Sequence, residues 1–386
     1  MEGEFFVIEW LLRNRGGCAT IDAKGGGDML FRKKKRWLTL SGIVGTVLLI
    51  VLGYLCYVLF SYSRIEDRQV LQPTQTGQDG ALAVGKTYTA VTQNVGFGAY
   101  TPEFTFFMDG GTQSWAESEE SVLACIRAAA EKVGEADPDF ILFQEVDTDS
   151  TRSYHIDQQR LLTEWFADYS SVFAVNYHSA FLAYPFTQPH GASNSGLLTL
   201  SKQNVTSAVR RSLPISESFS KFLDLDRCYA VSRIPVENGK ELVLYNVHSS
   251  AYGSSDEIRT AQMSMLLADM QAEAAKGNYT ICGGDFNHDF TGDSTQRLNG
   301  GEAVDFGWAQ PFPAELLPDG IRRCTDYQKL TPTCRNCDLP YEEGNFTIIV
   351  DGFLVSDNVT AVSVENVSTG FAYSDHNPVV LQFILN

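Results

Sequence analysis

Gly283-Gly284-Asp285-Phe286-Asn287-His288-Asp289 is the stretch that decides the fold, and it directly follows the apolar run Tyr279–Cys282. The two glycines allow the chain to leave a buried strand by a tight turn. Asp285 and Asn287 then place a carboxylate and an amide two residues apart. A carboxylate that activates water beside an amide that donates to an oxyanion suits phosphate-ester chemistry. An ordinary strand-to-loop exit uses the same residue types, so the rest of the chain decides between the two interpretations.

Composition favours a large folded body with an acidic surface. The chain has 386 residues, of which 44% are hydrophobic, which is ample for a buried core. Residues 1–60 contain 8 of the 29 Lys and Arg residues and 5 of the 47 Asp and Glu residues. Residues 61–386 therefore carry a formal charge of −21. A body this acidic has no electrostatic footprint for long nucleic acid. Composition therefore argues against a processive DNA-binding protein.

An uncharged run of 23 residues, Leu38–Phe60, predicts a transmembrane helix, because a helix of this length spans the hydrocarbon core of a bilayer. The bulky residues after it do not form a clear cleavage site, which favours an uncleaved signal anchor. Five bases at Arg32–Arg36 place residues 1–37 in the cytoplasm and the body outside the cell. A start at Met29 would make residues 1–28 spurious or an extension.

Residues 61–84, rich in Gln, Thr, Gly and Asp, are interpreted as a stalk, and the folded domain is expected at 85–386. Within this domain predicted strands alternate with three predicted helices, which indicates sheets covered by helices. The helices are expected around Val122–Val133, Asp157–Phe166 and Glu257–Ala275. The strands are expected at Thr87–Gln93, Phe140–Phe143, Ser171–Val175, Gly196–Leu200, Tyr229–Val236, Glu241–Val247, Tyr279–Cys282, Thr347–Val350 and Val379–Leu385.

Polar side chains follow strand after predicted strand. If neighbouring strands end at one edge of the sheets, these side chains form a single cluster of acids, amides and two histidines. Six coincidences in the same setting make isolated loop residues a poor explanation. The residues are Asn94, Glu145, His248, the pair Asp285 and Asn287, Asp351, and the segment Ser374-Asp375-His376-Asn377-Pro378.

In this order the motifs resemble those of the endonuclease/exonuclease/phosphatase superfamily, which includes deoxyribonuclease I, abasic-site endonucleases, inositol polyphosphate 5-phosphatases and neutral sphingomyelinases. The resemblance covers roughly Gly85–Asn386 and implies a four-layer α/β/β/α sandwich of two facing sheets, with the site on the rim between them. The matching segments are Gln93-Asn94, Gln144-Glu145-Val146, Asn246-Val247-His248, Gly284-Asp285-Phe286-Asn287, Val350-Asp351-Gly352-Phe353 and Ser374-Asp375-His376-Asn377-Pro378.

Chemistry and the resemblance agree on the expected roles. Asn94, Glu145 and Asp375 form an oxygen-rich site that suits Mg²⁺, with Mn²⁺ or Ca²⁺ as alternatives. The other polar residues are expected to carry out the reaction. Asp285 would orient or deprotonate water, Asn287 would donate to the phosphate, Asp351 would fix the tautomer of His376, and His248 would be the second imidazole. Which histidine is the acid and which the base stays open.

Other residues give weaker signals. Arg227 and Asn194 are candidate substrate contacts, although an exposed arginine and a turn asparagine explain them as well. His178 and His190 are either on the substrate side or on the surface. Three cysteines in a Pro-rich loop predict one disulfide of unknown pairing, with a zinc site as the alternative. They are Cys324, Cys334 and Cys337.

The sequence thus predicts a membrane-anchored, outward-facing, Mg²⁺-dependent phosphoesterase that hydrolyses a phosphodiester or phosphomonoester. The substrate is a small molecule, a lipid or a nucleic acid, and no protein partner is evident. An extracellular nuclease of the same family is one alternative. An idle surface-binding module is another, but it would be expected to lack some of the site residues. A calcineurin-like phosphatase is disfavoured because Asp285 is followed by Phe286-Asn287 and a Gly-Asn-His motif is absent.

Overall fold

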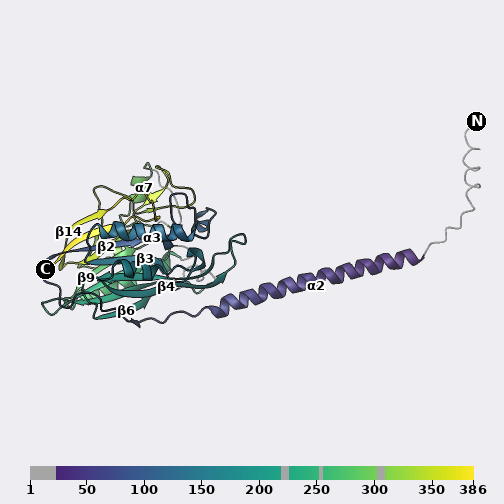
Figure 1. Cartoon of the computed structure of the whole chain (residues 1–386), viewed down its shortest axis with the longest axis horizontal. Helices are drawn as coiled ribbons and strands as arrows, with labels where there is room; N and C mark the ends of the chain where they lie inside the picture. Colours follow the sequence, from purple (N-terminus) through teal and green to yellow (C-terminus); the bar gives the residue numbers. More distant parts are fainter. Residues whose placement is uncertain (1–22, 219–225, 252–254, 302–307, 309) are drawn as a thin grey trace, which may run out of the picture. The chain divides into compact units, whose positions relative to one another are not determined.

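The chain divides after Phe60 into two compact units, each described here by itself. This computed structural model describes residues 23–218, 226–251, 255–301, 308 and 310–386. The first unit contains helix α2, Ala23–Ser61, in which the stretch Phe31–Ser61 is long and apolar enough to cross a membrane (Figure 1). The span expected at Leu38–Phe60 lies inside this helix, and a signal sequence would have the same length and composition. The interpretation of residues 1–22 lies outside the described residues.

Two large sheets build the second unit, with the strand orders β1-β6-β7-β8-β9-β13-β10 and β14-β15-β2-β3-β5-β4. A small third sheet pairs β11 with β12. The strands are β1 Gln69–Leu71, β2 Thr87–Asn94, β3 Phe140–Asp147, β4 Ser170–Leu182, β5 Gly191–Ser201, β6 Ser207–Ser212, β7 Cys228–Pro235, β8 Glu241–His248, β9 Tyr279–Asp285, β10 Ile321–Cys324, β11 Cys334–Arg335, β12 Thr347–Ile348, β13 Asp351–Ser356, β14 Val359–Asn366 and β15 Val379–Leu385.

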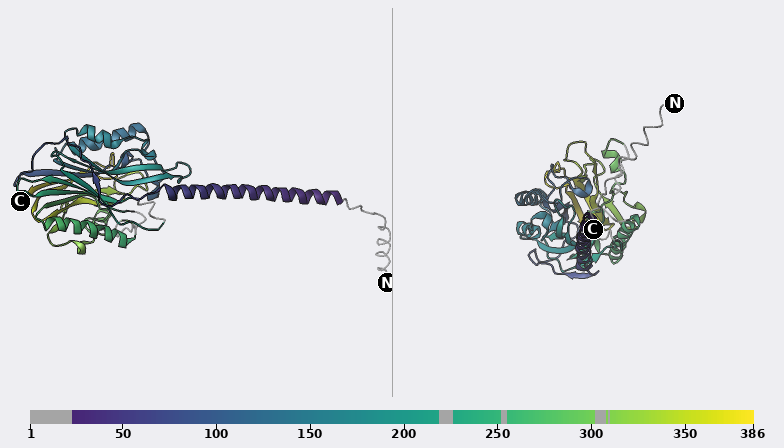
Figure 2. Two further views of the ribbon diagram at one scale, coloured as in Figure 1. Left: turned by 90° about the horizontal axis from the view of Figure 1, so that it is seen from below. Right: turned by 90° about the vertical axis from the view of Figure 1, so that its right-hand side faces the viewer.

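Helices cover the outer faces of both sheets, which confirms the four-layer sandwich (Figure 2, left). The helices α3 (Glu119–Gly134) and α4 (Gln158–Trp165) cover the six-stranded sheet, and α6 (Asp256–Ala274) covers the seven-stranded one. Side chains at the caps of these helices accept backbone N–H groups, as expected for Ser and Asp. The shorter elements are α7 Ser294–Leu298, η1 Gly96–Gly98, η2 Phe107–Asp109, η3 Thr151–Ser153 and η4 Ala314–Leu316.

Strand β3 shows why the chain forms layers. Its side chains alternate between the two faces of the sheet. Phe140 and Leu142 face the core between the sheets, whereas Ile141 and Phe143 pack under α3. All four side chains are fully buried, so β3 is a central strand with apolar contacts on both faces. This double burial explains the unbroken apolar run in the sequence.

The stalk expected at residues 61–84 is wrong, because this segment packs on the body. Strand β1 pairs with β6, and the backbone N–H of Ile65 donates to Asp226 Oδ1 over 2.9 Å. Leu82 is only 1% exposed and exchanges backbone hydrogen bonds with Pro235 and Glu237. A few apolar side chains and a short ladder are enough to dock a segment whose composition is that of a linker.

Two further expectations need correction. The predicted strand Thr347–Val350 is instead the short β12 followed by β13, which begins at Asp351. The cysteines of the Pro-rich loop are thiols in this structure rather than a disulfide. Cys334 and Cys337 lie close to each other, since their Sγ atoms are 3.4 and 3.8 Å from the carbonyl oxygen of Arg335, but both are free thiols.

Candidate active site

The ends of strands from both sheets meet at one rim. In the seven-stranded sheet, the parallel pair β8–β9 sets His248 opposite Asp285, and the antiparallel pair β9–β13 sets Asp285 opposite Asp351. In the six-stranded sheet, β2 ends at Asn94. The Nδ2 atom of Asn94 donates to Asp285 Oδ2 over 3.1 Å and so links the two sheets at this rim. The predicted cluster therefore exists, with Asp351 beginning a strand rather than following one.

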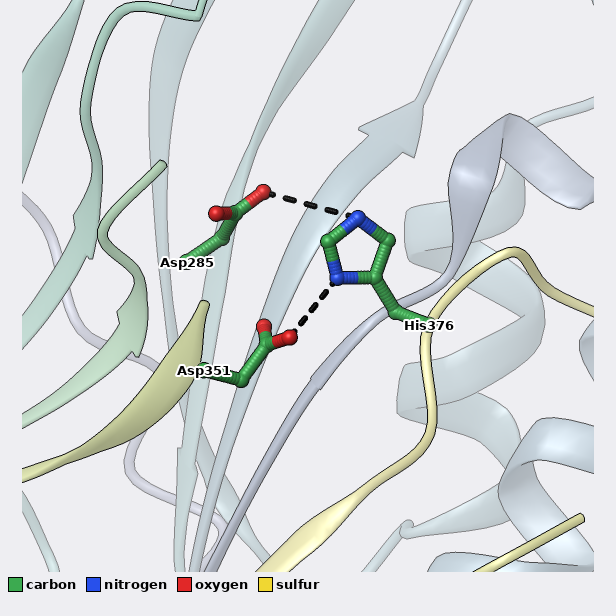
Figure 3. Close-up of side chains that lie close together, drawn as sticks. All are labelled: Asp285, Asp351 and His376. Carbon is green, nitrogen blue, oxygen red and sulfur yellow. Dashed lines mark hydrogen bonds and ion pairs between the residues drawn. The ribbon is translucent and has the colours of Figure 1, made fainter. Parts of the chain in front are cut away.

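His376 lies between two buried aspartates (Figure 3). Its Nδ1 is 2.8 Å from Asp351 Oδ2, and its Nε2 is 3.7 Å from Asp285 Oδ2. Ser374 fixes the loop that carries this histidine, because its Oγ donates to Asn94 O and accepts the backbone N–H of His376. The hydrogen bond from Nδ1 leaves Nε2 directed toward Asp285.

Glu145 enters the site through an irregularity in β3. The register of β3 with β5 shifts between Phe143 and Val146, and Glu145 has a φ of 54°. A bulge of this kind re-aims a side chain that regular alternation would place elsewhere. Glu145 Oε1 accepts from Asn94 Nδ2 over 3.2 Å and lies 3.9 Å from His248 Nε2. His248 Nε2 is also 3.4 Å from Asp285 Oδ2.

The turn after β9 sets the backbone conformation and the hydrogen bonds of Asn287. Its φ is 48°, a left-handed conformation that asparagine tolerates better than most residues. Its backbone N–H donates to Asp285 Oδ1, and its Nδ2 donates to the carbonyl oxygen of Ser249, each over 2.9 Å. Asn287 lines the cleft, and its side chain already holds the neighbouring loop in place. Its role as a donor to phosphate stays a prediction.

Burial and neighbouring charges shift the pKa values in opposite directions. Burial raises the pKa of Asp285 to about 6, and it raises that of Asp375 to about 7. Burial alone would lower the pKa of His376, but Asp351 and the other acids hold it well above 6.5. Burial lowers the pKa of His248 well below 6.5. The site thus combines a charged imidazole, a neutral imidazole and carboxylates that bind protons readily.

The carboxylates of Glu145 and Asp375 fit a divalent metal. Both line the cleft, and among the described residues neither is bonded to a lysine or an arginine. Gly96 leaves space beside Asp375, because a Cβ at this position would lie 2.7 Å from Asp375 Oδ1. Asn94 fits less well, since its Oδ1 accepts from Gly96 N and its nitrogen faces the carboxylates. As a ligand it would require rotation of the amide.

A second cluster, Asp285, Asp351 and His376, also places possible ligand atoms within 4.8 Å of one another. Its geometry favours a hydrogen-bonded relay, because both nitrogens of His376 face carboxylates and Nδ1 is already bonded to Asp351.

The site lies in an open cleft of about 880 Å³. Arg227 and His190 line this cleft and are buried, so neither is the exposed surface residue that was the alternative, and their contact with substrate stays a prediction. Burial lowers the pKa of His190 to about 3, so its imidazole is neutral. Asn194 does not line the cleft, because β5 alternates and presents Ser195 instead. His178 is also outside and pairs with Asp226 at 2.6 Å.

Sequence reasoning missed several residues of the cleft. Arg152 stacks on Phe97 at 3.9 Å and is held by Asp147, while Arg335 and Trp308 line the cleft from distant loops. Each lies in an irregular segment without periodicity. The sequence signal that accompanied Arg335 was the cluster of cysteines around it.

A family model described as the Endonuclease/Exonuclease/phosphatase family matches residues 91–376. The chain belongs to the endonuclease/exonuclease/phosphatase family. Members of this family are metal-dependent phosphoesterases and nucleases, which makes this chain an enzyme that hydrolyses ester bonds. A comparison with curated proteins finds no significant match.

Solved structures of the endonuclease/exonuclease/phosphatase family share the fold at low sequence identity. A family protein from Beutenbergia cavernae DSM 12333 is 17% identical, with a TM-score of 0.50 over 78% of this chain and 72% of its own. The 2′,3′-cyclic phosphatase ANGEL2, in complex with adenosine-2′,3′-vanadate, is 14% identical, with a TM-score of 0.51 over 78% of this chain and 96% of its own. These likenesses establish the fold alone.

Proposed function

We propose that this chain is a membrane-anchored, Mg²⁺-dependent phosphoesterase whose body faces outward. The observation that carries the chemistry is the buried arrangement of His376 between Asp351 and Asp285, with Asn94, Glu145 and His248 beside it. An idle module would not be expected to retain this complete set of acids, amide and histidines.

The residues of the site support hydrolysis by water. Asp285 is buried, and its raised pKa suits a group that accepts a proton from water near neutral pH. Asp351 holds the Nδ1–H of His376, so Nε2 is oriented to contact the phosphate. Glu145 and Asp375 would hold the metal, with Asn94 as a third ligand after rotation of its amide. A bound Mg²⁺ polarises the phosphate and offsets the charge of the transition state.

The first experiment assays the full chain in detergent micelles on bis-p-nitrophenyl phosphate, plasmid DNA, inositol phosphates and sphingomyelin. Each substrate is assayed with Mg²⁺ and with EDTA. Hydrolysis of at least one substrate that depends on Mg²⁺ supports the proposal. Turnover that EDTA leaves unchanged on every substrate would overturn the metal mechanism.

The matched variants are His376→Ala and His155→Ala. His376→Ala should lower kcat by about 10²–10⁴-fold, the range for a proton-transfer group, while the melting temperature stays close to the parent. His155 pairs with Asp149 on the surface, so His155→Ala should leave kcat unchanged. Near-normal activity of His376→Ala contradicts the assignment.

The topology rests on α2 and on the bases Arg32–Arg36. Protease treatment of intact cells should remove the body from Ser61 onward. Complete protection of the body, with digestion only after permeabilisation, would place it on the cytoplasmic side.

A further inference from the structure

Arg335 is a buried arginine in the wall of the catalytic cleft. Arg335 lies in β11, and only 1% of the residue is exposed to solvent. Its backbone N–H donates to the carbonyl oxygen of Asp375 over 3.0 Å. The backbones of Cys334 and His376 form an isolated antiparallel β-bridge. The loop segment that carries Arg335 is therefore attached to the loop that carries the catalytic histidine.

The guanidinium of Arg335 is only partly satisfied. Its Nη2 donates to the carbonyl oxygens of Thr101 and Phe104, at 2.9 and 3.4 Å. Nε and Nη1 are buried and have no hydrogen-bond partner among the residues that the structure describes. A buried charge with unpaired donors costs free energy unless an anion or another acceptor reaches it. The ring of Tyr341, 5.8 Å away, does not provide such an acceptor.

Two other buried arginines of the same unit, Arg152 and Arg210, have no buried guanidinium nitrogen without a partner. Arg152 also lines the cleft, but its Nε and Nη2 donate to Asp147 over 3.1 and 2.9 Å. Arg210 uses Nε, Nη1 and Nη2 to bond Val175, Ser212 and Asp226. Arg259, buried outside the cleft, lacks a partner at Nε alone, because its Nη1 and Nη2 donate to Trp308 and Asp256. Among the described buried arginines, Arg335 differs in that two of its guanidinium nitrogens, Nε and Nη1, are unpaired.

We propose that Arg335 binds a second anionic group of the substrate, a phosphate or a carboxylate, beside the phosphate that is hydrolysed. This proposal rests on the proposed phosphoesterase function and defines its substrate class. Oxyanions match the donors of a guanidinium in charge and in hydrogen bonding. Since the body carries a charge of −21, a local cation of this kind is needed to favour a doubly anionic substrate.

An alternative role for Arg335 is to act through Asp375 alone. In that case its replacement would change the affinity for Mg²⁺ and would weaken all phosphate ligands alike. A direct contact with a second anion changes only the ligands that carry one. The affinities of two ligands that differ only in the second anionic group therefore distinguish the two roles.

The test uses isothermal titration calorimetry on the full chain in detergent micelles with Mg²⁺. One ligand pair is adenosine 5′-monophosphate and adenosine 3′,5′-bisphosphate, which differ by a phosphate. The other is glycerol 3-phosphate and 3-phosphoglycerate, which differ by a carboxylate. The parent should bind the doubly anionic member of at least one pair about 10-fold more tightly, as expected for one charged hydrogen bond. The pair that shows the preference identifies the second group.

Arg335→Met should remove most of this preference and leave the singly anionic ligands within about twofold. Arg335→Lys should retain part of it, because the charge is kept. Arg322→Met is the control, since Arg322 is partly exposed on β10 outside the cleft. If Arg335→Met does not fold, as judged by its melting curve, Arg335→Lys and Arg335→Gln carry the comparison.

Equal binding of both members of each pair by the parent would overturn the proposal, as would an unchanged preference in Arg335→Met. If Arg335→Met weakens the binding of all four ligands by the same factor and also weakens Mg²⁺ binding, the role of Arg335 is to position Asp375 instead. Turnover of bis-p-nitrophenyl phosphate is measured separately. Its absence in the parent refutes the proposed function, whereas turnover with equal binding refutes only the second subsite.

Discussion

Asp351 and Asp285 contact opposite nitrogens of the same imidazole, and this difference separates their roles. Asp351 accepts from Nδ1 of His376 at hydrogen-bond distance, whereas Asp285 lies farther from Nε2 and also contacts Asn94 and His248. We therefore expect Asp351 to position the imidazole of His376. Asp285 is buried but lines the cleft, so we expect it to act on the attacking water.

Asp351→Asn tests this division at the scale of a single residue. The amide keeps the shape of the carboxylate but can donate to Nδ1, which would favour the wrong tautomer of His376. Turnover should fall by about 10²–10⁴-fold while the melting temperature changes little. Asp357→Asn is the control, because Asp357 lies on the surface. A variant with Asp351→Asn that kept its kcat and pH profile would show that the tautomer is unimportant.

The junction between β8 and β9 decides whether the site forms. Gly284 has a φ of 154°, and a Cβ there would lie 2.0 Å from the backbone oxygen of Val247. At Gly283 the nearest atoms to a Cβ belong to the side chains of Phe353 and Leu142, which can shift. Backbone atoms of a central parallel pair cannot move in this way without breaking the ladder.

Gly284→Ala should therefore destabilise the protein by more than Gly283→Ala, with a loss above about 3 kcal/mol for Gly284→Ala. Urea denaturation of both variants, followed by tryptophan fluorescence, measures the difference. The order of the two losses is the decisive result, and the opposite order would show that the strand can relax around position 284.

The contact of α6 with β7 gives a pH-dependent prediction. Glu273 on α6 accepts from Arg233 over 2.6 and 3.2 Å, and from Asn278 and Lys276 over 2.8 Å each. Burial alone would raise the pKa of Glu273, but these partners lower it to about 2 from 4.5. A lowered pKa in the folded state means that Glu273 stabilises the fold above pH 4.5, and that this contribution is lost as the pH falls toward 2.

Glu273→Gln should lower the free energy of unfolding by about 1–3 kcal/mol at pH 7, because charged hydrogen bonds are lost. The difference from the parent should shrink between pH 4.5 and pH 2. Melting curves across this range measure the effect, with Glu315→Gln on the surface as the control. A constant difference at every pH would contradict the linkage.

At the scale of the whole molecule, the segment before Gly85 belongs to the folded body. Strand β1 covers the edge of β6, and Leu82 is buried in the core between the sheets. A truncated chain that begins at Gly85 loses both. It should melt at a lower temperature than a chain that begins at Ser61, since burial of one leucine contributes about 1.5–3 kcal/mol. Its exposed edge should also favour aggregation.

Differential scanning calorimetry and size-exclusion chromatography of the two truncated chains provide the measurement. Equal melting temperatures and equal elution as monomers would show that residues 61–84 act as the stalk that their composition suggested.

The sequence by itself determined the family, the four layers and the residues of the rim. A motif such as Gly284-Asp285-Phe286-Asn287 can be recognised from a few consecutive residues. The apolar pattern of a strand shows where the strand ends, and therefore which polar residue lies at that end. Asn94, His248 and Asp285, each the last residue of its strand, therefore meet as expected.

Only the tertiary structure decided which atoms face the cleft. A bulge with a positive φ turns Glu145 inward, strand alternation turns Asn194 away, and a contact with Gly96 turns the nitrogen of Asn94 toward the acids. Arg335 enters from a loop with no periodic pattern. These choices depend on partners far away in the sequence, because the direction of a side chain is set by the strand or loop that packs against it.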